Sequence, residues 1–306
     1  MSLRIGDNVN KVKSKKVWAY RLMVLPGVVL LFMFCYVPMG GIVMAFQNFV
    51  PAKGLWNSEW VGLKNFTRLF TLPGIGDVFW NTIVISIAKI ILGIIVPVIF
   101  AILLNEAKNI GFRRVVQTVV YLPNFISWVI LGTVFKQVFG MYGPVNNVIT
   151  SLGFPELSFL TNGSLFRGLL IGTDVWKNFG FGTIVYLAAI LGISPQLYEA
   201  ARMDGATRWQ RIWHVTLPGM KPTIVLMATL ALGNVLNGGF EQILNMYNTM
   251  VYDKADIIDT FVYRMGLVNV QYSLATAVGL LKSVISAVLI ILAHYLAEKF
   301  ADYRIF

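Results

Sequence analysis

Six long apolar stretches constrain the fold of this chain more than any other feature of its sequence. A helix needs about 20 mainly apolar residues to cross the hydrocarbon core of a bilayer. The stretches cover residues 23–46, 80–104, 115–139, 165–193, 222–246 and 274–296. Because lipid offers the backbone no hydrogen-bond partner, a spanning segment of this length is expected to be helical. The sequence therefore predicts an all-α integral membrane protein with six transmembrane helices.

Charge is scarce in this chain. Only 13% of its 306 residues are charged, against about 25% in an ordinary soluble domain, and the mean hydropathy is +0.70. These values exclude a soluble enzyme or binding domain, and they exclude a disordered chain, which needs low hydrophobicity. The single cysteine, Cys35, excludes a disulfide framework. His214 and His294 have no companion at metal-ligand spacing, so no metal site is expected.

The distribution of positive charge predicts the orientation in the membrane. Fifteen lysines and arginines fall in the N-terminal segment, the second-to-third loop, the fourth-to-fifth loop and the C-terminal tail, whereas five fall in the other loops. Cytoplasmic loops carry an excess of these residues. Both termini are therefore expected in the cytoplasm, as a segment 1–22 and a tail 298–306 that flank a membrane domain 23–297. The positive charge also suits contact with membrane lipid, and no nucleic-acid partner is expected.

The cytoplasmic loop 194–218 has the clearest local pattern. Its opening Ser194-Pro195 suits the N-cap and first position of a helix. Gly205 is expected to break that helix, because glycine accepts a positive φ. A second short helix is expected over residues 207–215, and Leu217-Pro218 is expected to stop it before the fifth span. The loop thus predicts two short helices joined by a sharp turn, a shape that suits docking into a groove on another protein.

The same loop resembles the EAA loop of ABC-importer permeases. That pattern reads Glu-Ala-Ala, three residues, Gly, nine residues, then Ile-x-Leu-Pro. Here residues 199–201 are Glu-Ala-Ala, Gly205 follows at the matching distance, and Val215 replaces the isoleucine. The resemblance implies that Glu199 pairs with a basic residue of a partner ATPase and that Gly205 is the hinge between the two helices. The coupling residues that it implies are Glu199, Ala200, Ala201, Asp204, Gly205, Ala206, Leu217 and Pro218.

Other segments narrow the resemblance to carbohydrate permeases. The first span and the outer segment 61–66, Val-Gly-Leu-Lys-Asn-Phe, are similar to the sugar-permease branch. Residues 258–264, Ile-Asp-Thr-Phe-Val-Tyr-Arg, resemble the LplB-like branch, which is associated with complex oligosaccharides. The resemblance implies the type I ABC importer permease fold and a place in the cytoplasmic (inner) membrane of a bacterium. It also implies a function: import of an oligosaccharide or polysaccharide-derived carbohydrate by alternating access.

The resemblance implies the partners as well. They are a second homologous permease, two copies of an ABC ATPase, and an extracellular solute-binding protein. The chain has no Gly-x-x-x-x-Gly-Lys-Ser/Thr phosphate loop, so ATP and magnesium are expected on the partner ATPase. We therefore expect a non-catalytic translocase subunit that has no cofactor of its own.

Polar residues inside the spans are candidates for the substrate pathway. They are costly in a membrane and usually face a cavity, and carboxylates, amides and aromatic rings are the groups that recognise sugars. The candidates are Trp176, Asn178, Asn234, Asn237, Glu241, Gln242 and Asn245. Four of those in the fifth span recur every three or four residues, which predicts that they share one helical face. The alternative is that these residues only hold helices together through hydrogen bonds.

Other charged residues receive simpler interpretations. Lys89 and Lys282 lie within spans, where packing or snorkelling is expected. Asp253, Asp256 and Asp259 are expected to form a solvated face or to contact the binding protein. Three other functions remain open: an ABC permease for a non-sugar solute such as an amino acid or phosphonate, a membrane enzyme, and a stand-alone secondary transporter. An enzyme needs a clustered catalytic set and a secondary transporter usually shows matching halves, and neither is visible.

Overall fold

The computed structural model describes residue 18 and residues 20–301, except for the side chains of 293, 294 and 296–301. The predicted cytoplasmic segments 1–22 and 298–306 lie largely outside the described residues. The chain is mostly helical, as predicted. Four helices are long and apolar enough to cross a membrane, or up to six if each of two bent pairs is one span.

The first apolar helix runs from Tyr20 to Phe46 and stands apart from the rest of the chain. It contains a π-helical turn η1 (Phe32–Tyr36), a short α2 (Val37–Met39) and a 3-10 segment η2 (Gly40–Phe46). None of its most apolar window is buried inside the chain, so its side chains, Cys35 included, face whatever surrounds the subunit. Only its end is anchored, because η2 packs on the last helix.

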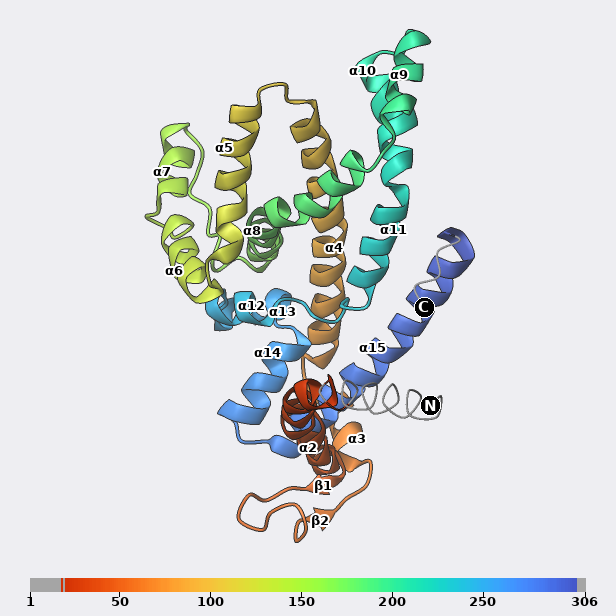
Figure 1. Ribbon diagram of the computed structural model, residues 1–306. Coiled ribbons are helices and arrows are strands. Elements are labelled where there is room, and N and C mark those ends of the chain that lie inside the picture. Colours follow the sequence, from red (N-terminus) through yellow and green to blue (C-terminus); the bar gives the residue numbers. More distant parts are fainter. Residues whose placement is uncertain (1–17, 19, 302–306) are drawn as a thin grey trace, which may run out of the picture.

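A small outer subdomain follows the first helix. Strands β1 (Gln47–Asn48) and β2 (Glu59–Trp60) form an antiparallel hairpin, and α3 (Lys64–Phe70) packs beside it. The amide of Asn65 joins the two parts, donating to the carbonyls of Ala45 and Gln47 at 2.9 Å each. Figure 1 shows this hairpin at one end of the molecule and helices α9 (Pro195–Met203) and α10 (Arg208–Arg211) at the opposite end.

Two long helices form the centre of the molecule. Helix α4 (Ile75–Glu106) and helix α8 (Gly163–Leu191) cross in Figure 1 and form the most extensive helix contact of the chain. Their apolar core also takes in α11 (Leu217–Leu232), which contributes the fully buried Met220. Because all three helices are highly apolar, their contact surface depends on close packing rather than on the hydrophobic effect.

The third predicted span is bent. Helix α5 (Ile110–Tyr121) runs into η3 (Leu122–Phe125), and α6 (Trp128–Val138) then turns by 103°. Pro123 lies in this bend and cannot donate a backbone hydrogen bond. Helix α8 stabilises the bend, because the ammonium of Lys177 donates to the carbonyl of Asn124 at 2.7 Å. The remaining helix on this side is α7 (Pro144–Ser151), which follows the turn at Gly143.

The contact between α8 and the bend requires glycine at position 180. A Cβ atom there would collide with the backbone carbonyl of Val120. We expect Gly180→Ala to lower the free energy of unfolding by about 1–3 kcal/mol, the usual cost of overpacking a well-packed site. Gly172→Ala on the same helix is the matched control, since nothing lies within 4 Å of its added Cβ. Thermal unfolding in detergent measures both, and equal midpoints for the two variants would refute this account of the packing.

The fifth predicted span is wrong as a single helix over residues 222–246. Helix α11 ends at Leu232, and α12 (Phe240–Met246) begins only after a non-helical segment. We call residues 233–239 the break. Glycine is its cause: Gly239 has φ +92°, and an added Cβ there would lie 2.6 Å from the ammonium of Lys89. Non-helical backbone is tolerated at membrane depth where protein or a cavity surrounds it. Here other parts of the protein surround the break, and it borders two cavities that are described below.

The chain then returns through short helices to the last span. These are η5 (Thr249–Val251), α13 (Tyr252–Ala255), α14 (Ile258–Tyr263) and the π-helical η6 (Arg264–Val268). The last helix is α15 (Tyr272–Ala301). In Figure 1, α12 and α13 lie across the middle of the molecule beside α4, α14 slopes down below them, and α15 rises obliquely on the other side of α4. The break therefore lies among α4, α8, α14 and α15.

Candidate functional site

A lysine from α4 holds one side of the break. The Lys89 ammonium donates to the carbonyl of Gly238 at 2.8 Å and to the side-chain oxygen of Gln242 at 2.5 Å. It also lies 3.5 Å from a carboxylate oxygen of Asp174 on α8. Gln242 in turn donates to Thr173 Oγ1 at 2.8 Å and to the Leu170 carbonyl. The Gly238 carbonyl lies in the break and has no helical hydrogen bond, so the hydrogen bond from Lys89 satisfies it inside the protein.

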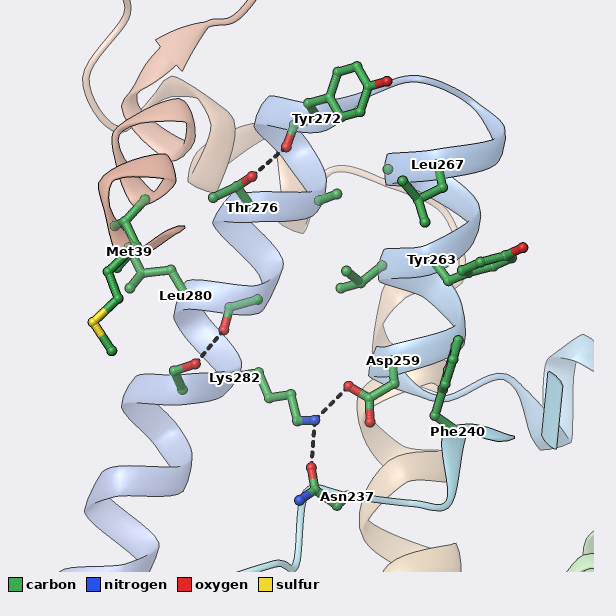
Figure 2. Close-up of a pocket in the computed structure, with 16 residues that line it drawn as sticks. Met39, Asn237, Phe240, Asp259, Tyr263, Leu267, Tyr272, Thr276, Leu280 and Lys282 are labelled. Atoms are coloured by element: carbon green, nitrogen blue, oxygen red, sulfur yellow. Dashed lines mark hydrogen bonds and ion pairs between the residues drawn. The ribbon is translucent and has the colours of Figure 1, made fainter. Parts of the chain in front are cut away.

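A second lysine holds the opposite side of the break. Figure 2 shows Lys282 reaching from α15 toward Asp259 on α14 and toward Asn237 in the break. Its ammonium lies 2.5 Å from Asp259 Oδ1 and 2.8 Å from Asn237 Oδ1. Two intramembrane lysines, each paired with a carboxylate, thus fix the break from two different helices. Snorkelling is therefore wrong for both lysines, because each ammonium turns inward to a carboxylate instead of outward.

Two cavities meet at the break. The Lys89 cavity has a volume of about 290 Å³ and lies among α4, α8 and α11, with Asp174 and Asn234 in its wall. The Lys282 cavity has a volume of about 980 Å³ and lies among α14, α15 and the first helix. Asn237 lines both. A polar group that lines two cavities is a candidate for contact with a solute.

The structure separates the predicted pathway residues instead of placing them on one face. Asn234 and Asn237 lie in the break and line cavities, and the amide of Asn237 donates to Asn234 at 3.2 Å. Glu241 and Asn245 lie on α12, beyond the turn at Gly239, where the Asn245 amide donates to the Glu241 carbonyl. The prediction of a shared helical face is wrong, because the glycines of the break interrupt the helix between these two pairs.

The other three candidates have identifiable structural contacts. Gln242 is fully buried in the Lys89 network described above. Asn178 accepts a hydrogen bond from Asn124 at 3.1 Å and so helps α8 to hold the bend of the third span. The ring of Trp176 packs edge-on against Phe135 at a centroid distance of 5.6 Å. For Gln242 and Asn178 the structure supplies the interhelical hydrogen bonds that the alternative interpretation expects, whereas Trp176 is 46% exposed and lines a separate cavity of about 560 Å³.

The outer acidic residues are not a uniformly solvated face. Asp256 is buried and forms a two-point ion pair with Arg264, and Thr260 donates to it at 2.7 Å. Burial lowers the pKa of Arg264, but the hydrogen bond and charge of Asp256 raise it more, so the pKa lies above its usual value. Burial, with the neighbouring Tyr252, raises the pKa of Tyr247 to about 12. Both pKa shifts keep Arg264 charged and Tyr247 neutral at neutral pH.

The predicted cytoplasmic loop forms two helices joined by a turn, as expected. Helix α9 (Pro195–Met203) is followed by a turn in which Gly205 has φ +73°. Helix α10 (Arg208–Arg211) begins with a capping box between Thr207 and Gln210. The Tyr198 hydroxyl meets Thr216 Oγ1 at 3.0 Å and ties α9 back to the chain below α10. The turn is thus a defined structure, although Ser194 makes no side-chain cap.

The prediction that Leu217-Pro218 stops the second helix is wrong. A π-helical turn η4 (Ile212–Thr216) joins α10 to α11, so one helix runs from Arg208 to Leu232. Proline at 218 cannot donate to the carbonyl four residues earlier. In the π turn the Leu217 N–H bonds instead to the Ile212 carbonyl, five residues back. The loop is therefore continuous with the helix of the fifth span.

The surface of this loop is open in the single chain. Glu199, Ala200, Asp204 and Gly205 are exposed, and Ala201 and Ala206 are partly so. Within the described part of the chain, neither Glu199 nor Asp204 forms an ion pair. Exposed apolar side chains stand among them, with Met203 88% and Trp209 69% exposed. Small, acidic and apolar groups together form a surface that suits a protein partner.

Comparison with known proteins shows the family. Residues 93–302 match the family model of the binding-protein-dependent transport system inner membrane component. The chain belongs to this family. It is therefore a permease subunit of an ABC transporter, and its fold is the type I ABC permease fold.

Its relatives include two permeases of Bacillus subtilis (strain 168). The polygalacturonan/rhamnogalacturonan transport system permease protein YteP is 44% identical, over 93% of this chain and 89% of its own length. Protein LplB is 40% identical, over 94% of this chain and 91% of its own length. A permease chain of a bacterial ABC transporter involved in the import of the acidic polysaccharide alginate is 36% identical. It superposes with a TM-score of 0.87 over 97% of this chain and 99% of its own.

Proposed function

We propose that this permease moves a carbohydrate, either an oligosaccharide or a polysaccharide-derived fragment, across the cytoplasmic membrane of a bacterium. The observation that carries the proposal is Asn237, whose amide lies in the break and lines two cavities. Amides, carboxylates and aromatic rings surround it, and these groups recognise sugar hydroxyls and sugar faces. The relatives support a carbohydrate, since permeases for polygalacturonan, arabinooligosaccharides and galactooligosaccharides are among them. They do not favour an amino acid or a phosphonate.

The energy for transport comes, in this proposal, from a partner ATPase that docks on α9 and α10. Glu199 and Asp204 offer carboxylates to its basic residues, and the small side chains of Ala200, Ala201 and Ala206 permit close approach. Closure of the ATPase on ATP moves this loop, and the continuous helix from Arg208 to Leu232 transmits the movement to the break. ATP thereby shifts the equilibrium between inward-open and outward-open states through its different affinity for them.

The proposed assembly contains a second homologous permease, two ATPase subunits and an extracellular binding protein. A solved alginate ABC transporter related to this chain was captured with a periplasmic protein bound to an alginate pentasaccharide. We propose six spans in this chain, with both termini in the cytoplasm, because that orientation puts most lysines and arginines inside. It also places α9 and α10 inside and the β1–β2 hairpin outside, which agrees with their opposite positions in Figure 1.

Replacing Asn237 by alanine tests the pathway directly. We expect the uptake of labelled oligosaccharide to fall about 2- to 10-fold, which corresponds to the loss of one hydrogen bond with a net worth of about 0.5–1.5 kcal/mol. Assembly should be kept, as judged by size-exclusion chromatography of the complex. Asn147→Ala on α7 is the matched control, because that exposed side chain makes no hydrogen bond within the described chain. Unchanged uptake in Asn237→Ala would remove this residue from the pathway.

A further inference from the structure

We propose that the Lys282 cavity binds the carboxylate of an acidic sugar unit and that Lys282 selects acidic over neutral saccharides. This inference rests on the proposed function and narrows its substrate class. It concerns the α14–α15 side of the break, a different place from the predicted pathway set, of which only Asn237 lies in this cavity.

The cavity has the size and lining of a saccharide site. Its volume of about 980 Å³ is at the upper end of the usual range for small-ligand pockets, about 300–1,000 Å³. Aromatic side chains from three segments line it, namely Phe240, Tyr263 and Tyr272. Aromatic rings stack on the apolar faces of sugars. The hydroxyls of Thr276 and Ser283 donate to backbone carbonyls of their own helix, and their oxygens remain acceptors for sugar hydroxyls.

The charge in the cavity wall is one exchangeable ion pair. Lys282 is the single cation and Asp259 the single carboxylate among its lining residues. Their side chains are 16% and 25% exposed, whereas the Asp256 carboxylate paired with Arg264 is only 4% exposed. The Lys282–Asp259 pair thus borders open space on both partners. An incoming group can reach both of its members, whereas in the Asp256 pair only Arg264, at 20% exposed, borders open space.

The ammonium of Lys282 has capacity for a further acceptor. It carries three N–H groups, and Asp259 and Asn237 are the two acceptors that it meets in the described chain. A sugar carboxylate offers Lys282 the same chemical contact that Asp259 already makes, so the two carboxylates compete for the ammonium, and Asp259 keeps partial access to solvent when it is displaced. A neutral sugar has no group that replaces Asp259 in this way, because hydrogen bonds to neutral acceptors are roughly half as strong.

Exchange between carboxylates also suits transport. A transported solute must bind well enough to enter and weakly enough to leave. Asp259 acts in this proposal as a resident competitor: it keeps the Lys282 charge balanced when no substrate is present and displaces the substrate afterwards. The relatives agree with this substrate class, because alginate is an acidic polysaccharide and polygalacturonan is a polymer of an acidic sugar.

Competition predicts opposite effects for the two members of the pair. Lys282→Gln removes the attraction and should abolish the preference for an acidic sugar. Asp259→Asn removes the competitor and should strengthen the binding of an acidic sugar about tenfold, in line with the value of a hydrogen bond to a charged group. A purely structural ion pair would respond in the same direction to both changes. The double variant Lys282→Gln/Asp259→Asn leaves no unpaired charge, so it tests selectivity in a chain whose stability is protected.

The experiment uses the complete transporter in lipid nanodiscs, without the binding protein, so that only the membrane subunits select. Equilibrium dialysis compares labelled trigalacturonate with its carboxyl-reduced, neutral trisaccharide. We expect the wild type to bind trigalacturonate about tenfold more tightly than the neutral sugar. We expect Asp259→Asn to widen that ratio and Lys282→Gln and the double variant to bind both sugars alike.

The outcomes separate this inference from the proposed function. Equal weakening of trigalacturonate binding by Lys282→Gln and Asp259→Asn would show that the ion pair has only a structural role, and it would overturn the inference. So would a wild type that binds both trisaccharides equally, and in each case a carbohydrate permease would still stand. Binding of neither trisaccharide, together with no stimulation of the ATPase by any loaded binding protein, would instead contradict the proposed function.

Discussion

Replacing Lys89 by alanine is expected to lower the free energy of unfolding by about 3–5 kcal/mol, the usual cost of removing one partner from a buried ion pair. The change would leave three acceptors without their donor: the buried Gln242 side-chain oxygen and Gly238 carbonyl, and the Asp174 carboxylate, whose side chain is 21% exposed. The last of these belongs to the break, so the loss would act directly on the segment that we place in the pathway. Thermal unfolding of the purified subunit complex in detergent would measure it.

Two variants make this result specific. Lys64→Ala changes a lysine in the outer helix α3 that belongs to none of the described ion pairs, and it should leave the unfolding midpoint unchanged. Lys89→Met combined with Asp174→Asn removes both charges and should regain part of the loss, because an uncompensated charge costs more than a missing pair. If Lys89→Ala unfolded like the wild type, or the double variant were no better than the single one, the network would not hold the break.

Gly205→Ala is expected to reduce ATP-driven uptake about 5- to 30-fold. Gly205 has φ +73° and open space around its Cα, so an added Cβ meets no neighbour. The substitution acts only through the left-handed backbone, which costs about 1–2 kcal/mol for other residues. The turn between α9 and α10 would relax, and the two helices would lose the angle at which they meet the ATPase. Uptake into proteoliposomes and basal ATPase activity would be measured together.

Gly153→Ala separates coupling from general strain. Gly153 has φ +83° and nothing within 4 Å, and it ends α7 far from the α9–α10 loop. Its backbone cost is the same, but uptake should be kept. If both glycine variants lost uptake equally, the defect would come from folding and not from the coupling turn. If neither lost uptake, the assignment of Gly205 as the hinge would be wrong.

Local patterns in the sequence predicted the turn of the coupling loop well. Gly205 after a short helical run is a local signal, and its positive φ follows from chemistry that glycine carries alone. The end of the second helix was not predictable in the same way. Pro218 is a strong helix stop in isolation, yet the π turn before it lets the helix continue. Packing of Leu217 and Met220 against α4 and α8 favours that continuation.

The break shows what the sequence conceals. Residues 222–246 are apolar enough to be one span, and polar residues at helical spacing suggest a single face. The glycines that end the helix at the break can be seen in the sequence, but the mean hydropathy of a window that contains them is still high enough for a span. The partners of the break were not visible at all, since Lys89 and Asp174 lie 85 positions apart in the chain, and Lys282 is remote from both. Only the crossing of α4 and α8 and the oblique path of α15 bring these charges to one place.

The intramembrane charges themselves were the usable signal. Lysines and aspartates within apolar helices are rare and pair with one another when they occur. The spans contained both signs, so a search for ion pairs between spans would have favoured pairing over snorkelling for Lys89. The same search would have missed Lys282, because its partner Asp259 lies outside the six predicted spans. It would not have named the pairs, because each depends on the depth and rotation of two helices.

The most direct test of the central claim is the ATPase activity of the complex that co-purifies with this chain from native membranes. We predict that a second permease and an ABC ATPase come with it. We also predict that a binding protein loaded with an oligosaccharide stimulates ATP hydrolysis for one class of sugar, and that Gly205→Ala removes this stimulation. A chain that purifies alone, or a complex whose ATPase responds to no saccharide-loaded binding protein, would contradict the account of a carbohydrate-importing permease.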